Sequence, residues 1–162
     1  IIEIETESLE KIIFPVGFYR RKAVYLKETA VMLRDQYNSD IPRTIEEMVK
    51  LKGVGPKMAH LLYNMAWASR KDDIAPSGIG VDVHVHRISN RLGWVKSKTP
   101  EQTREQLEQL LPQDLWIPVN PLLVGFGQRI CKANYPKCSE CAVAHLCPSS
   151  SVRKGLARAN TK

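Results

Sequence analysis

The strongest constraint in this sequence is the placement of its cysteines. All four lie in one segment with the spacing Cys131-x6-Cys138-x2-Cys141-x5-Cys147, and the rest of the 162-residue chain contains none. Disulfide scaffolds distribute their cysteines so as to join distant segments. Four thiols this close together therefore indicate one metal or cluster site in a reducing compartment. The residues alone allow either a tetrahedral zinc ion or a [4Fe–4S] cluster, although a single short loop favours one compact cluster.

Charge and hydropathy narrow the class of partner. The formal net charge is +7 and the isoelectric point is about 9.3, which suits a polyanion such as nucleic acid or an anionic membrane surface. No apolar run approaches the length of a membrane span, and the acidic start from Ile1 to Ser8 does not resemble a secretory signal. With 43% hydrophobic residues, we expect one compact core or two small lobes and no membrane partner.

The apolar pattern is helical nearly throughout. Thr44 with Glu47 and Thr99 with Gln102 predict helix starts, and a polar loop is expected from Arg70 to Gly80. Pro118 and Pro121 are expected to delay the helix that follows them, so that it starts at about Asn120. Apolar residues recur at helical spacing in five segments: 9–14, 23–33, 56–65, 85–92 and 107–111.

A glycine hairpin reads Leu51-Lys52-Gly53-Val54-Gly55-Pro56-Lys57. Two glycines around one apolar residue permit a tight turn between helices. We expect the amides of Gly53, Val54 and Gly55 to point outward at a helix start, which favours phosphate binding. A plain helix–helix turn is the alternative on local sequence alone.

A third motif spans Gly80 to Arg87. Asp82 is placed to cap the helix that follows it. His84 and His86 are two residues apart and point to different sides of a helix, which argues against a shared metal ion. We expect a packing or hydrogen-bonding role for His84 and phosphate proximity for His86 and Arg87.

These three motifs resemble those of the endonuclease III family, over about Leu9 to Pro148. The cysteine spacing is similar to the iron–sulfur loop of that family, which implies a [4Fe–4S] cluster held by Cys131, Cys138, Cys141 and Cys147. The cluster is implied to be structural, with Lys132 and Lys137 on its loop meeting the DNA backbone.

The resemblance also implies the catalytic residues. The hairpin looks like the family's L-P-G-V-G-x-K motif, with Lys52 in place of proline, and it maps the nucleophilic lysine onto Lys57. The segment around Asp82 looks like G/A-V-D-T-H, with Val83 in place of threonine, and it maps the essential aspartate onto Asp82. Phe18 falls where the family has an apolar wedge that enters the duplex when a base is flipped; a core aromatic is the alternative.

The implied architecture is all-α and two-lobed, a helix-hairpin-helix DNA glycosylase fold. Residues 1–75 are expected to form a partial barrel lobe, residues 76–148 an iron–sulfur lobe, and residues 149–162 a basic, disordered tail. Relatives carry more helices ahead of the matched region, so the barrel lobe is expected to be incomplete at its N-terminus and to expose apolar helix faces. Lys57 and Asp82 are expected to face each other across a cleft.

The implied activity is that of a bifunctional DNA glycosylase and AP lyase acting on oxidised pyrimidines. A monomer that binds double-stranded DNA with a damaged base or abasic site, in the nucleus or mitochondrion, fits this interpretation. Three alternatives stay open: a monofunctional glycosylase of the same superfamily, which Lys57 argues against, a non-catalytic DNA-binding fragment, and a zinc-stabilised interaction domain.

Overall fold

A computed structural model describes residues 1–68 and 75–152, and throughout these residues its regular secondary structure is helical. The predicted all-α class is confirmed. The chain divides into two compact units, Ile1–Ile74 and Ala75–Lys162, next to the boundary predicted at residue 75. In the part of the chain described, no helix is both long enough and apolar enough to cross a membrane.

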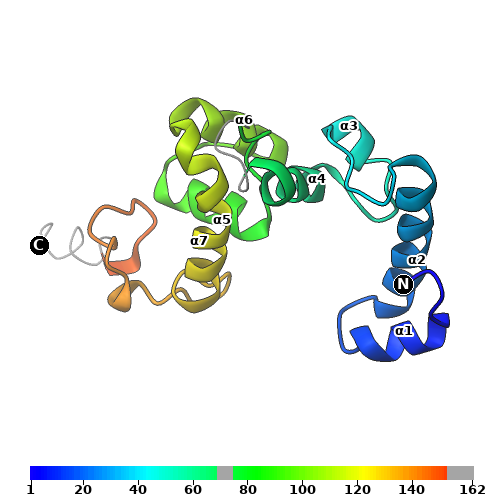
Figure 1. Cartoon of the computed structure of the whole chain (residues 1–162). Helices are drawn as coiled ribbons and strands as arrows, with labels where there is room; N and C mark the ends of the chain where they lie inside the picture. The colour runs from blue at the N-terminus through cyan, green and yellow to red at the C-terminus, as the bar shows by residue number, and fades with distance from the viewer. Residues whose placement is uncertain (69–74, 153–162) are drawn as a thin grey trace, which may run out of the picture. The chain divides into compact units, whose positions relative to one another are not determined.

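The first unit is built from helix pairs, coloured blue to green in Figure 1. Helix α1 packs on α2, and the short α3 packs on α4. A π-helical turn, η1, continues α4 without a break, and Trp67 in that turn donates from Nε1 to the carbonyl of Pro42 at 3.1 Å. The elements are α1 (Thr6–Ile13), α2 (Tyr19–Gln36), α3 (Ile45–Met48), α4 (Pro56–Tyr63) and η1 (Asn64–Ala68).

Local capping chemistry begins α3 where the sequence predicts. The Thr44 hydroxyl accepts from the Glu47 amide at 3.2 Å, and the same hydroxyl donates to the Glu47 carboxylate at 3.0 Å. This satisfies one of the amides that a helix start leaves without a partner. The predicted cap is confirmed.

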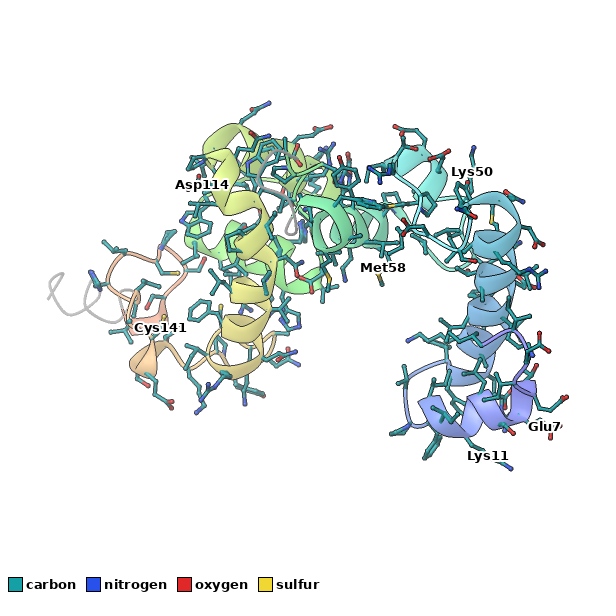
Figure 2. The ribbon with its side chains drawn as sticks, in the orientation of Figure 1. Glu7, Lys11, Lys50, Met58, Asp114 and Cys141 are labelled. Atoms are coloured by element: carbon teal, nitrogen blue, oxygen red, sulfur yellow. The ribbon has the colours of Figure 1, made fainter. Side chains whose placement is uncertain are left out.

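Apolar side chains stand exposed on this unit. Ile12, Phe14 and Met65 are each more than 60% exposed, and Met58 on α4 is 49% exposed (Figure 2). An apolar groove of about 430 Å³ runs between α1, α2, the hairpin and α4. The predicted exposure of apolar helix faces is therefore present in the first unit.

The second unit surrounds one buried cluster. Its helices are α5 (Val83–Leu92), α6 (Pro100–Leu110), the 3-10 turn η2 (Gln113–Leu115), α7 (Trp116–Arg129) and the 3-10 turn η3 (Cys138–Glu140). Both α6 and α7 pack on α5. The buried apolar side chains belong to these three helices and to the segments that lead into α5 and α6: Ile79, Val81, Val85, Ile88, Val95, Leu107, Val119 and Leu123.

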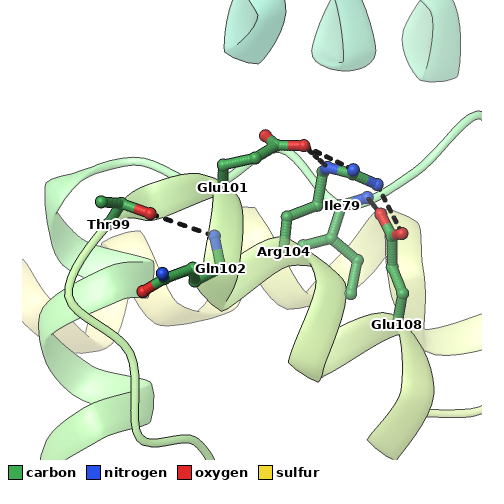
Figure 3. A network of polar contacts seen from close by, with 6 residues as sticks. All are labelled: Ile79, Thr99, Glu101, Gln102, Arg104 and Glu108. Atoms are coloured by element: carbon green, nitrogen blue, oxygen red, sulfur yellow. Dashed lines mark hydrogen bonds and ion pairs between the residues drawn. The ribbon is translucent and has the colours of Figure 1, made fainter.

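A polar network fixes α6 to the segment before α5, as Figure 3 shows. Arg104 pairs with Glu101 and Glu108 of the same helix, and the Glu108 carboxylate also accepts from the Ile79 amide at 2.9 Å. The hydrogen bond with Glu101, supported by Glu108, raises the pKa of Arg104 above its ordinary value. Thr99 caps the helix by accepting from the Gln102 amide, as predicted.

The start of α7 differs from the prediction. The helix begins at Trp116 and contains Pro121, whereas a start near Asn120 was expected. Pro118 falls in the first turn, where amides have no intrahelical acceptor, so its missing N–H costs nothing there. Pro121 does remove one helical bond, but buried neighbours compensate, because Val119 and Leu123 enter the core and Asn120 donates to the Gly80 carbonyl at 2.5 Å.

Two segments with a sequence-based prediction lie partly outside the described residues. The expected loop from Arg70 to Gly80 is described only from residue 75 onward, and it is non-helical there. Of the tail expected at residues 149–162, the structure describes residues 149–152, in which Ser150 is buried.

The core of the second unit generates a stability prediction. Leu107 is fully buried in α6, whereas Leu110 on the same helix is 53% exposed. Leu107→Ala should lower the free energy of unfolding by about 2–5 kcal/mol, because it removes buried methyl groups and leaves a cavity. Leu110→Ala should change it by no more than about 0.5 kcal/mol. Urea denaturation followed by circular dichroism measures both, and equal effects would contradict the assigned core.

Candidate functional site

The glycine hairpin connects α3 to α4 and depends on its two glycines. Gly53 has φ +78°, and a Cβ added there would lie 2.8 Å from Cδ2 of Tyr25 on α2. Gly55 is the N-cap residue of α4. The Val54 amide donates to the Leu51 carbonyl at 3.1 Å and so closes the turn itself. Of the three hairpin amides predicted to bind phosphate, that of Val54 is therefore already used. The amides of Gly53 and Gly55 donate to no backbone acceptor in the described chain, so these two can still bind an anion.

Lys57 stands in the first turn of α4, directly after Gly55 and Pro56. Lys57 is exposed, and so is Pro56 before it. Proline at the first helical position suits a helix start, because its fixed φ is already helical. The local sequence therefore presents a primary amine at the positive end of a helix dipole, beside the hairpin amides.

Asp82 is the N-cap of α5, as predicted. Its Oδ1 atom accepts from the amides of His84 and Val85, each at 2.8 Å. Two bonds to one oxygen fix the carboxylate at the helix start, where its negative charge is favoured by the helix dipole. Lys57 belongs to the first unit and Asp82 to the second, and their expected facing across a cleft stays a prediction.

The four cysteines follow α7 in one segment, which contains the 3-10 turn η3 and in which Figure 2 labels Cys141. All four are free thiols and half-buried. In the residues described, no three Cys, His, Asp or Glu side chains come close enough together to hold a metal ion. Hydrogen bonds from the Ser151 amide and hydroxyl lower the pKa of Cys138, which favours the thiolate that metals bind. By its chemistry, the donor set fits a soft metal ion or an iron–sulfur cluster.

Helix α5 also faces the beginning of this segment. Arg91 donates to the carbonyls of Lys132 at 2.6 Å and Ala133 at 2.8 Å, and its Nη1 lies 3.5 Å from the Cys131 sulfur. One turn earlier, Arg87 donates to the Cys131 carbonyl at 2.9 Å. Sequence reasoning missed the role of Arg91 altogether. Its position four residues after Arg87, on one helix face, was the available signal.

His84 and Arg87 pack where α7 has a glycine. His84 Nδ1 lies 3.1 Å from Nη2 of Arg87, so the expected hydrogen-bonding role of His84 is confirmed. A Cβ at Gly127 would clash with His84 Nδ1 and would lie 3.0 Å from Arg87 Nη2. Gly127 is therefore required for the close approach of the two helices.

The remaining residues predicted to contact DNA lie in different settings. His86 Nδ1 is 2.6 Å from the Thr103 hydroxyl, a contact between α5 and α6. Phe18 lies directly before α2, and its backbone has a left-handed conformation. Its side chain is 83% exposed, so the alternative of a core aromatic is wrong. Lys132 is exposed, and Lys137 is exposed and pairs with Glu140 at 3.0 Å. The DNA contacts themselves stay predictions.

Comparison with known proteins places the chain in a family. Residues 1–113 match the family described as HhH-GPD superfamily base excision DNA repair protein. The chicken (Gallus gallus) endonuclease III-like protein 1 is 53% identical over 152 residues, which are 93% of this chain and 52% of that protein. Endonuclease III of Thermotoga maritima is 42% identical over an alignment of 163 positions, which covers 100% of this chain and 73% of that protein.

A solved structure agrees with both. A trapped covalent intermediate of endonuclease III with DNA superposes with a TM-score of 0.80 at 33% identity, covering 94% of this chain and 69% of that one. The chain spans about half the length of the vertebrate relatives it matches. The family match, the identities and the shared fold together show that this chain belongs to the endonuclease III family, within the HhH-GPD superfamily of base excision DNA repair proteins.

Proposed function

We propose that this chain carries the hairpin, the nucleophile and the cysteine site of a DNA glycosylase that is also an AP lyase. The observation that carries the proposal is the position of Lys57, an exposed primary amine in the first turn of α4, next to the hairpin glycines. The solved relative that was trapped as a covalent intermediate with DNA supports an enzyme nucleophile in this fold. A monofunctional glycosylase needs no such amine.

The chemistry proposed for Lys57 is covalent catalysis at the sugar. Its unprotonated Nζ attacks C1′, the N-glycosidic bond breaks, and the electron pair leaves with the base, which takes up a proton. Ring opening gives an imine between Nζ and C1′. Loss of a C2′ proton then expels the 3′ phosphate by β-elimination. The substrate class is duplex DNA with an oxidised pyrimidine, extruded from the stack, or with an abasic site.

Asp82 would act beside this reaction through its charge. The carboxylate is held by the His84 and Val85 amides, so it is oriented before the substrate arrives. A fixed negative charge near C1′ stabilises the positive charge that develops as the base departs. It can also carry protons to and from the lysine amine.

Two groups of residues are proposed to meet the DNA. The Gly53 and Gly55 amides fit a backbone phosphate at the start of α4, and the exposed ring of Phe18 fits a wedge between bases. Lys132 and Lys137 supply exposed positive charge on the cysteine segment. Residence in the nucleus or mitochondrion, and a monomeric state, stay predictions.

We infer that Cys131, Cys138, Cys141 and Cys147 hold a [4Fe–4S] cluster. Four thiols without a disulfide, with Arg91 and the Ser151 amide directed at two of the sulfurs, suit a soft, anionic thiolate site. When bound, the cluster would supply folding energy to the segment and no chemistry to the reaction.

The nucleophile prediction uses borohydride trapping on duplex DNA that carries an abasic site. The unchanged chain should give a covalent adduct, and Lys57→Ala should lower its yield by at least about a hundredfold, because the imine cannot form. Lys50→Ala is the matched control, since Lys50 is also an exposed lysine and lies just after α3 (Figure 2). Gel electrophoresis under denaturing conditions measures the yield.

Three outcomes separate the candidates. An adduct lost only in Lys57→Ala supports the lyase. An adduct that persists in Lys57→Ala contradicts Lys57 as the nucleophile. Salt-dependent binding to the duplex without any adduct would favour the non-catalytic DNA-binding fragment.

The cofactor prediction concerns metal content. The purified chain should be brown, should absorb near about 400 nm and should contain iron, because four thiolates in this spacing suit a cluster. Cys141→Ser should lose most of the absorbance, since one of the four ligands is removed. A colourless chain that contains one zinc per molecule would contradict the cluster and support the zinc-stabilised interaction domain.

A further inference from the structure

Two arginines on α5 connect the first cysteine to the helix that Asp82 caps. Arg91 makes three contacts with residues 131–133, to one sulfur and two carbonyls. Arg87 makes one contact there, to the Cys131 carbonyl, and its Nη1 also lies 3.4 Å from the Val83 carbonyl in the first turn of its own helix. The two guanidinium groups thus hold Cys131 from both its carbonyl and its sulfur.

The contacts continue from Arg87 to the carboxylate. Arg87 Nη2 is shared between the Cys131 carbonyl and the ring of His84. The amide of His84 in turn donates to Asp82 Oδ1. A continuous series of contacts therefore runs from Cys131 through Arg87 and His84 to Asp82, entirely within the second unit.

The surrounding packing leaves this series little freedom to rearrange. Val85 and Ile88 on the neighbouring faces of α5 are fully buried. Gly127 on α7 lies so close to His84 and Arg87 that no larger side chain would fit. A displacement of Cys131 must therefore move Arg87, and with it the ring of His84, because the helix behind them is fixed in the core.

Simple capping of the carbonyls after α7 is the other explanation for the two arginines. It accounts for the bonds to the Lys132 and Ala133 carbonyls. It does not account for the approach of Arg91 to the Cys131 sulfur or for the sharing of Arg87 with His84. A bond from a guanidinium to sulfur strengthens when the sulfur becomes an anionic ligand, so its strength depends on what the thiols hold.

We propose that Arg87 and Arg91 are positioning residues that couple occupancy of the four-cysteine site to the orientation of Asp82. Loading of the thiols fixes Cys131 and with it the two guanidinium groups. Arg87 then holds the His84 ring and the Val83 carbonyl in the first turn of α5, and the Asp82 cap is held as a result. This rests on the proposed function only in the identity of the group that the thiols hold.

The test is amide hydrogen exchange, followed by NMR, on the 162-residue chain as purified. The His84 and Val85 amides report directly on Asp82, since both donate to its Oδ1. The Gln102 amide, which caps α6 through Thr99, is a reference in the same unit. Arg87→Gln and Arg91→Gln should each raise exchange at His84 and Val85 by about tenfold and leave Gln102 unchanged. Arg91→Lys should fall between, because it keeps the charge and loses the planar fork.

Arg129→Gln is the matched control. Arg129 is an exposed arginine two residues before Cys131, and its guanidinium group makes no hydrogen bond or ion pair within the described residues. The same loss of charge at Arg129 should therefore leave the exchange rates of the His84 and Val85 amides unchanged. Removal of the bound metal by a chelator should reproduce the effect of Arg91→Gln in the unchanged chain and should add nothing in the variant.

The outcomes distinguish this proposal from the proposed function. Equal acceleration at Gln102 would mean that the arginines only stabilise the whole unit, which overturns the coupling. Unchanged exchange at His84 and Val85 after metal removal overturns it as well. A chain that holds neither iron nor zinc as purified would remove the cofactor from the proposed function and, because no site is then loaded, the coupling with it. Strand cleavage plays no part in these readings.

Discussion

The second unit depends on the burial of one helix, α5, between α6 and α7. Val85 and Ile88 pack into the shared core, so polar side chains can occupy the other faces of the helix. Its start carries the carboxylate of Asp82, and its remaining face carries Arg87 and Arg91. One rigid helix therefore positions both the Asp82 carboxylate, at its start, and the beginning of the cysteine segment, through Arg87 and Arg91.

The first unit depends in the same way on a backbone constraint. Gly53 takes a left-handed conformation against the ring of Tyr25, so the hairpin that leads into α4 passes close to α2 at a point where only glycine fits. Lys57 is then fixed within the first turn of α4 by sequence distance alone. Each unit thus presents one of the two residues proposed for catalysis at a helix start, where hydrogen bonds and steric contacts between near neighbours hold the backbone.

The features that sequence could predict are those determined by near neighbours. The caps at Thr44, Asp82 and Thr99 each join a side chain to an amide two or three residues away, so a local pattern is sufficient to find them. The predicted start of α7 was wrong because the prolines can be read from the local sequence, whereas the burial of Val119 and Leu123 cannot. That burial stabilises the helix despite its prolines. The contacts of Arg91 span about forty residues. The spacing from Arg87 places both arginines on one helix face, but it does not identify the segment that they contact.

The two arginines also show why net charge alone misleads about individual cations. A charge of +7 predicts a polyanion, and phosphate proximity was expected for Arg87 from its motif. In the fold its guanidinium is used by the Cys131 carbonyl and His84, whereas Lys132 and Lys137 stand in solvent on the cysteine segment. This division follows from chemistry, because a planar, weakly hydrated fork suits fixed carbonyls and a strongly hydrated ammonium does not. In the proposed complex with DNA, the salt dependence of binding should accordingly arise from such lysines, whereas the arginines should stabilise the cysteine segment.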